Sequence, residues 1–238
     1  MHTRSTAITA GITDMLPLLV GAAPFGLIFG ALALNAGLSP LQTFGMSLLV
    51  FAGSAQFIAV SLLAAGVSLP VLWLTTLVVN LRHALYSASV QPHIGHWPAR
   101  WRYLLSFVLT DELFAVFDAR LRRDGDTPTT RWYLLGCGVA MYGTWLLATL
   151  AGIALGQQVP QLRDWGLEFA MVATFAAIVA PQLRDSPVLV AALTASACAL
   201  LLRGLPYKLD LLLAALFGIL GGILTETLLR RPAGELQA

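Results

Sequence analysis

The stretch VVNLRHALYSASV, Val78 to Val90, decides how this chain is interpreted. Most of its residues suit a segment in lipid, yet it also carries Asn80, Arg82 and His83. Polar and ionisable side chains are costly within a bilayer, where they pair with one another or face a water-filled cavity. The stretch therefore predicts a membrane helix whose polar residues are either paired or functional.

The composition predicts an integral membrane protein. Of the 238 residues, 58% are hydrophobic and only 11% are charged, whereas about a quarter of a soluble domain is charged. Apolar runs of about 17 to 25 residues recur along the chain, which is the length that crosses a bilayer as a helix. The net charge of +2 is too small to indicate nucleic-acid binding.

The apolar segments predict an all-α, polytopic transmembrane bundle of about eight spans, forming one integral membrane domain over residues 1–238. A polar connection, Arg120 to Arg131, divides the chain into two possible halves, 14–119 and 132–229. The predicted spans are Asp14 to Ala36, Leu41 to Ala65, Leu69 to Val90, Tyr103 to Ala119, Trp132 to Gly156, Gly166 to Gln182, Pro187 to Arg203 and Lys208 to Leu229.

The basic residues predict the orientation of these spans. With the N-terminus inside, eight spans place the connection 120–131 in the cytoplasm and the WPARWR loop, 97–102, outside. Lys and Arg are then in excess on the inside, in agreement with the positive-inside rule. If an early span were a re-entrant hairpin, the WPARWR loop would move to the cytoplasm and the excess would grow, so seven spans is the alternative.

The first two spans contain residues that disturb helices. Pro24 precedes Gly26 in the first span, and proline removes a backbone hydrogen bond while glycine weakens the helix. Gly53, Ser54 and Gln56 lie in the middle of the second span. We therefore expect broken or kinked helices near Pro24 and Gly53. Such breaks expose backbone N–H and C=O groups, which can bind carboxylates and cations. An interhelical hydrogen bond is the alternative role for Gln56.

Small residues recur every four positions in the first and fifth spans. This spacing lets helices approach closely in lipid, so packing alone explains it. An internal duplication is the alternative, and many transporters bind substrate where two such halves meet. The residues are Ala22, Gly26 and Gly30, then Ala148, Gly152 and Gly156.

The fourth span carries charges of the opposite sign. Asp111 and Glu112 lie near its middle, where an ionised acid is costly. One explanation is an ion pair with Arg82 or His83 on the preceding span. The other is that one acid takes up and releases a proton, since burial and paired charges shift carboxyl protonation. Arg82 could instead be an anchor that reaches the membrane interface.

Four motifs resemble one known family. PFGLIFG, VFAGSAQF, NLRHALYS and DELF occur in that order before Arg120, and they resemble the AzlC family of branched-chain amino acid permeases, to which the YgaZ exporters belong. The resemblance implies export of leucine, isoleucine, valine and also methionine across the bacterial cell inner membrane, driven by the proton motive force. It also implies a partner, a small AzlD-like membrane protein.

The resemblance supplies candidate site residues. An amino acid zwitterion needs donors for its carboxylate, acceptors for its ammonium group and an apolar pocket. We expect proton coupling by Asp111, Glu112 and His83. We expect substrate binding by Pro24, Gly26, Gly53, Ser54, Gln56, Asn80, Arg82 and His83.

Other function classes receive less support. The sequence contains no HExxH, P-loop or glycine-rich dinucleotide motif. We therefore predict no enzyme activity, no catalytic residue, no cofactor and no metal site. The alternative to an exporter is a passive channel, or a structural subunit of a transport complex for another small metabolite.

Overall fold

The structure is a computed structural model that describes residues 3–158, 180, 183, 185–205 and 209–229, and its regular elements are helices. Contacts group the chain into two compact units, Met1–Leu167 and Glu168–Ala238. The predicted sixth span, 166–182, lies outside the described residues except at Ala180. The division into halves 14–119 and 132–229 stays a prediction.

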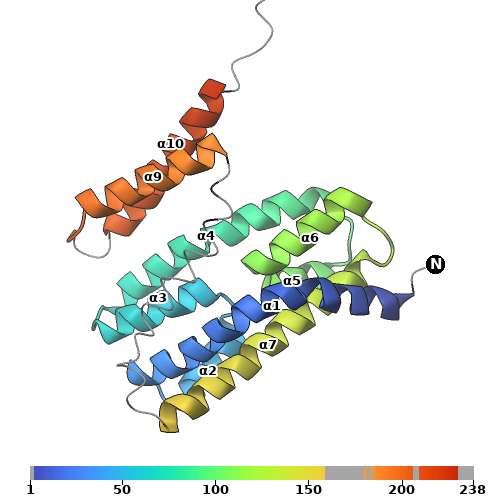
Figure 1. The fold of residues 1–238 in the computed structure, drawn as a ribbon, viewed down its shortest axis with the longest axis horizontal. Helices are drawn as coiled ribbons and strands as arrows, with labels where there is room; N and C mark the ends of the chain where they lie inside the picture. The colour runs from blue at the N-terminus through green and yellow to red at the C-terminus, as the bar shows by residue number, and fades with distance from the viewer. Residues whose placement is uncertain (1–2, 159–179, 181–182, 184, 206–208, 230–238) are drawn as a thin grey trace, which may run out of the picture. The chain divides into compact units, whose positions relative to one another are not determined.

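Helices α1 to α7 belong to the first unit, and α9 and α10 belong to the second (Figure 1). Their bounds are α1 (Arg4–Asn35), α2 (Pro40–Leu49), α3 (Gly53–Ala64), α4 (Leu69–Ile94), α5 (Ala99–Val108), α6 (Asp111–Asp124), α7 (Thr130–Gln158), α9 (Ser186–Leu201) and α10 (Leu209–Leu229).

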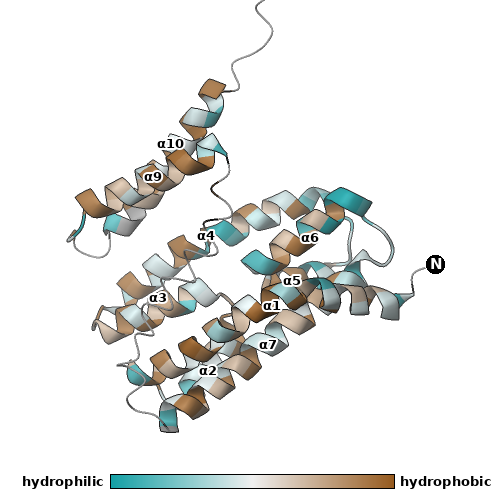
Figure 2. Ribbon diagram, viewed as in Figure 1, coloured by the Kyte–Doolittle hydropathy of each residue, from teal (hydrophilic) through white to brown (hydrophobic). Residues whose placement is uncertain are grey.

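Three helices of the first unit are long enough to cross a bilayer. In the described part of the chain, Arg4–Asn35 and Thr130–Gln157 are both long and apolar enough for a membrane span. Helix α4, with 26 residues, extends for about 39 Å. Hydrophilic residues midway along α4 and at the beginning of α6 interrupt the apolar surface (Figure 2).

Helices α1 and α7 pack closely and run parallel. A Cβ atom on Gly26 would lie 2.8 Å from the Cβ of Ala148, and one on Gly30 would collide with the carbonyl oxygen of Thr149. A Cβ atom on Gly152 would likewise collide with the Leu27 carbonyl. The two stripes of small residues therefore face each other, so close helix packing accounts for them.

The second predicted span is a broken hairpin. Helix α2 ends at Leu49 and α3 begins at Gly53. Across this break Gln56 donates from Nε2 to the Ser47 hydroxyl at 3.1 Å, and Met46 packs against Ala59 and its neighbours. The two helices thus run antiparallel, and the predicted break near Gly53 is confirmed.

The first span has no such break. Helix α1 continues from Arg4 to Asn35 with Pro17 and Pro24 inside it. A break near Pro24 is therefore wrong for this helix, whereas a kink there stays a prediction. The close contact with α7 extends along both sides of Pro24, from Gly11 to Gly30, and this packing supports the helix where the proline removes a hydrogen bond.

The fourth predicted span is also a broken hairpin. Helix α5 ends at Val108 and α6 begins at Asp111. At roughly 15 and 21 Å, each is too short to cross a hydrocarbon core of about 30 Å. Figure 1 shows the α4–α5 and α6–α7 connections at the end of the unit where the N-terminus lies.

Side-chain contacts join these two connections. Asp126 accepts a hydrogen bond from Trp97 Nε1 at 3.0 Å and pairs with His96 Nε2 at 2.9 Å. The rings of Trp101 and Trp132 lie 5.2 Å apart. The eight-span arrangement, which placed the WPARWR loop and the connection 120–131 on opposite sides, is therefore wrong. The alternative of an early re-entrant span fits α2 and α3, whereas the hairpin of α5 and α6 was not expected from the sequence.

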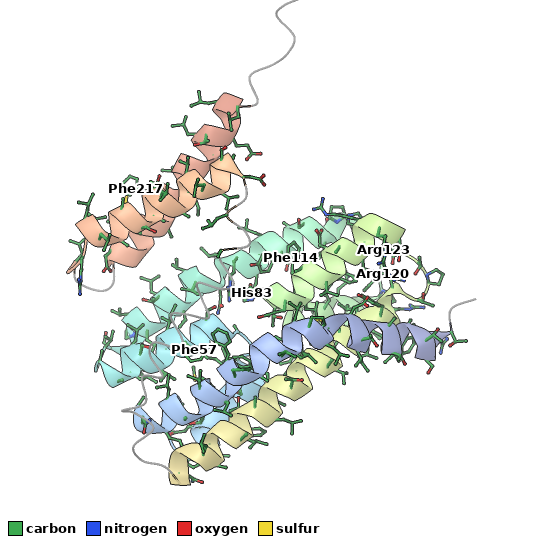
Figure 3. The ribbon with its side chains drawn as sticks, viewed as in Figure 1. Phe57, His83, Phe114, Arg120, Arg123 and Phe217 are labelled. Carbon is green, nitrogen blue, oxygen red and sulfur yellow. The ribbon has the colours of Figure 1, made fainter. Side chains whose placement is uncertain are left out.

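The arginines of the first unit lie mainly at the end where these two connections meet. The connections at the opposite end, 36–39 and 65–68, contain no Lys or Arg. Figure 3 labels Arg120 and Arg123 near the end of α6, and the Arg4 guanidinium lies 5.1 Å from the Trp132 ring. The positive-inside rule therefore favours a cytoplasmic location for the end that carries Arg4, Arg100, Arg102, Arg120, Arg122, Arg123 and Arg131.

This topology predicts a labelling pattern. In a background without Cys137 and Cys198, the variants His93→Cys and Arg123→Cys should both resist an impermeant maleimide added to intact cells. Both should react in inside-out vesicles, because the two positions share the cytoplasmic end.

The matched variants Asn35→Cys and Ser68→Cys, at the opposite end, should react in intact cells. Labelling of the His93→Cys and Arg123→Cys variants from opposite sides would contradict the hairpin arrangement.

Candidate functional site

Arg82 joins the two broken hairpins. From the middle of α4 its Nη1 donates to Asp111 Oδ2 at 2.5 Å, and its Nη2 donates to the Ser54 hydroxyl. Ser54 lies in the first turn of α3 and Asp111 is the first residue of α6. The ion pair expected between these spans is confirmed, and the guanidinium contacts both returning helices at the point where each begins.

The two helix beginnings differ in how they are capped. At α6, the Thr110 hydroxyl accepts from the Leu113 N–H at 3.4 Å, and two acidic residues occupy the first turn. At α3, the N-cap is Ala52, which provides no side-chain hydrogen bond. The first N–H groups of a helix lack intrahelical partners and carry a partial positive charge. The start of α3 is therefore the better site for an anion.

Aromatic rings bring the hairpin tips together. Phe51 lies between α2 and α3, and Phe107 is near the end of α5; their ring centroids are 6.2 Å apart. Tyr142 of α7 contacts both rings, at 5.0 Å from Phe51 and 5.5 Å from Phe107. The two hairpins enter the unit from opposite ends, so their tips meet inside it.

Two polar atoms of the Arg82–Asp111 pair, and one of Asn80 on the same helix as Arg82, have unfilled hydrogen-bonding capacity. Asn80 Oδ1, Asp111 Oδ1 and Arg82 Nε are buried and have no partner among the described residues. An unsatisfied buried donor or acceptor costs about 1 to 3 kcal/mol. The Arg82–Asp111 pair thus offers one acceptor and one donor to a polar ligand, and Asn80, two residues earlier on α4, has a further unpaired acceptor.

Aromatic side chains follow the Arg82 partners along α3, α4 and α6. Phe57 and Phe114 each lie three residues after the residue that binds Arg82, on α3 and α6. Phe114 stacks on Tyr86 with centroids 4.4 Å apart, and Tyr86 meets the His83 ring edge to face at 5.9 Å. Figure 3 labels Phe57 on α3, His83 on α4 and Phe114 on α6. The site combines charged groups with apolar walls.

The remaining predicted residues lie at different places. Glu112 is the second residue of α6, and its carboxyl interacts with the Thr110 side chain. Pro24 is exposed on α1. Gly26 packs against α7, and Gly53 lies under the Trp145 ring, where a Cβ atom would approach Cη2 to 2.9 Å. These two glycines permit close packing.

Gln56 belongs to a separate buried cluster. It is 0% exposed and donates to Ser47, whose hydroxyl lies 2.9 Å from that of Thr149. The interhelical hydrogen bond considered for Gln56 is thus present. Its Oε1 has no partner in the described part of the chain, and its binding of substrate stays a prediction.

The break before α6 was missed from the sequence. Thr110 followed by Asp111 and Glu112 is a typical helix start, because a hydroxyl caps the first turn and acids favour it. That signal lies inside an apolar run, which favours one continuous span. No motif or spacing in the sequence predicts the contact between Phe51 and Phe107.

Comparisons with known proteins agree on one family. The family described as AzlC protein matches residues 17–159. The chain is 30% identical over 227 residues to the inner membrane protein YgaZ of Escherichia coli, covering 93% of this chain and 90% of that protein. It is 27% identical over 221 residues to the branched-chain amino acid transport protein AzlC of Bacillus subtilis, covering 91% and 83%. No solved structure matches the chain.

The pair at the centre of the site predicts non-additive stability effects. Asp111→Asn leaves the Arg82 charge unpaired and Arg82→Gln leaves the carboxylate unpaired, so each should lower the apparent melting temperature by several degrees. Because the pair is partly exposed, each loss should fall below the ~3–5 kcal/mol of a fully buried pair.

The fall in melting temperature of the double variant should be smaller than the sum of the falls in the two single variants, since the double variant leaves neither charge alone. The surface pair of Arg122 and Asp118, at 2.7 Å, is the control and should give small effects. Additive losses at Arg82 and Asp111 would refute their direct coupling.

Proposed function

The chain belongs to the AzlC family, and from this membership we propose that it is a secondary transporter that exports branched-chain amino acids from the cell. It is an integral protein of the inner membrane, as its Escherichia coli relative is. The Bacillus relative is named for branched-chain amino acid transport. Export, its coupling to protons and the preferred substrate are parts of our proposal.

The observation that carries the proposal is the set of unpaired atoms at the Arg82–Asp111 pair and on Asn80. Asn80 Oδ1 and Asp111 Oδ1 accept hydrogen bonds, whereas Arg82 Nε donates one. An α-amino acid complements both kinds of atom, because its ammonium group donates and its carboxylate accepts. A ligand with one charge would leave part of this set unsatisfied.

We place the substrate between the beginnings of α3 and α6. Its carboxylate would lie at Arg82 Nε and the uncapped start of α3, where helix N–H groups favour an anion. Its ammonium group would lie at Asp111 and Asn80. The branched side chain would then contact the rings of Phe57 and Phe114, which lie one helical turn further on.

The hairpins provide a route for alternating access. With the arginine-rich end in the cytoplasm, α5 and α6 enter from the cytoplasm and α2 and α3 from the opposite side. Their tips meet at Phe51 and Phe107. Withdrawal of one hairpin at a time would open the Arg82 site to one side, which is the requirement of a secondary transporter.

We assign proton coupling to Asp111, Glu112 and His83. The ammonium group of the substrate and a proton compete for the same carboxylate, so release of one can accompany binding of the other. A small AzlD-like membrane protein is the proposed partner, on the basis of the family resemblance. The partner and this chain would together form the working exporter.

Export depends on the geometry of Arg82 in this proposal. Cells loaded with leucine-containing dipeptides and expressing this protein with its partner should release leucine faster than cells without it. Arg82→Lys keeps the charge but loses the planar fork that reaches Ser54 and Asp111 together, so export should fall at least about tenfold.

Arg102→Lys is the matched control at an exposed position, and its export rate should equal that of the unaltered protein. Unchanged export in the Arg82→Lys variant at equal membrane abundance would exclude the proposed site.

Proton coupling makes a separate prediction. A protonophore should abolish leucine export by the unaltered protein, whereas a passive channel would ignore it. Asp111→Asn or Glu112→Gln should remove the dependence of export on external pH, because the neutral side chain cannot exchange a proton. If both variants kept unchanged, proton-driven export, neither acid would be the coupling group.

A further inference from the structure

A cavity lies at the arginine-rich end of the first unit. It has a volume of about 380 Å³ and lies between the α4–α5 and α6–α7 connections. Sites for small molecules are typically about 300 to 1,000 Å³. The cavity is lined by His96, Trp97, Pro98, Asp126, Pro128 and Arg131, and these residues are distinct from those around Arg82.

The acidic wall of this cavity keeps an acceptor available. Trp97 Nε1 and His96 Nε2 both bind Asp126 through Oδ2, at 3.0 and 2.9 Å. A carboxylate has two oxygens and about four sites for hydrogen-bond donors. Asp126 Oδ1 can therefore accept from a ligand while Trp97 continues to hold the carboxylate in place.

The basic wall has an unpaired donor. Arg131 lies in the first turn of α7, and its guanidinium is 6.0 Å from the Trp101 ring. Its Nε atom is buried without a partner in the described ranges. The planar guanidinium suits a carboxylate, to which it can donate two parallel hydrogen bonds.

We propose that this cavity is a second amino acid site, which holds the substrate on the cytoplasmic side before it reaches Arg82. The substrate carboxylate binds Arg131 and its ammonium group binds Asp126, while Trp97, Pro98 and Pro128 contact the aliphatic side chain. The identity of the ligand rests on the proposed function. The cavity itself is defined by residues that the Arg82 site does not use.

The two connections that form the cavity are also the base of the α5–α6 hairpin. One precedes α5 and the other follows α6. A ligand that contacts Asp126 and Arg131 on one side and Trp97 on the other ties these connections together. Occupation of the cavity therefore stabilises the base of the hairpin while its tip remains free to move.

The test is the binding of radiolabelled L-leucine to the purified full-length chain in detergent. The unaltered protein should bind two leucines, and Asp126→Asn, Arg131→Gln and Arg82→Gln should each bind one. Leucinol lacks the carboxylate and 4-methylpentanoate lacks the ammonium group, so neither should compete well at either site. Arg100→Gln, an exposed arginine at the same end, is the matched control and should bind two.

Hydrogen exchange provides a readout that does not depend on stoichiometry. In the Arg82→Gln protein, leucine should slow backbone exchange at residues 94–98 and 125–131, and Arg131→Gln should remove this effect. A single leucine per chain that is lost with Arg82→Gln but kept with Arg131→Gln would overturn the second site and leave the central one intact. Binding of leucine only at 94–98 and 125–131 would overturn the central site instead.

Discussion

The charge of Arg82 inside a membrane helix is the constraint on which the first unit depends. An unpaired guanidinium would be costly at that depth, and α4 alone offers no counter-ion within reach. Asp111 provides the negative charge, and Ser54 accepts a further hydrogen bond. Two other segments must therefore bring polar groups to the same depth, which a pair of uninterrupted apolar helices would not do.

The broken hairpins meet that requirement. A helix that begins inside the membrane exposes N–H groups and allows polar residues in its first turn, because the hydrogen bonds of the preceding helix have already ended. Lipid would not tolerate such backbone, so it must be enclosed by protein. Phe51, Phe107 and Tyr142 enclose the tips, and the parallel pair of α1 and α7 forms the support behind them.

The same arrangement gives the proposed transporter its chemistry. The ion pair that neutralises Arg82 leaves Asp111 Oδ1 and Arg82 Nε unpaired, and Asn80 Oδ1 on α4 is unpaired as well, so the site is both held together and incomplete. A zwitterion would complete it, and a proton would compete for the same carboxylate. The cavity near the arginine-rich end also has an acid and an arginine, Asp126 and Arg131, in its lining.

The sequence by itself determined the membrane class, the polar residues of α4, Asp111 as a partner for Arg82 and the break near Gly53. These features depend on composition and local chemistry, which any single segment displays. Only the tertiary structure decided that α5 and α6 return to the same end, because apolar length fits a crossing span and a folded hairpin equally well. The contact of Asp126 with His96 and Trp97, 29 or 30 positions away along the chain, distinguishes the two. The absence of a break at Pro24 was likewise decided by the packing of α1 on α7, which supports the helix from outside its own sequence.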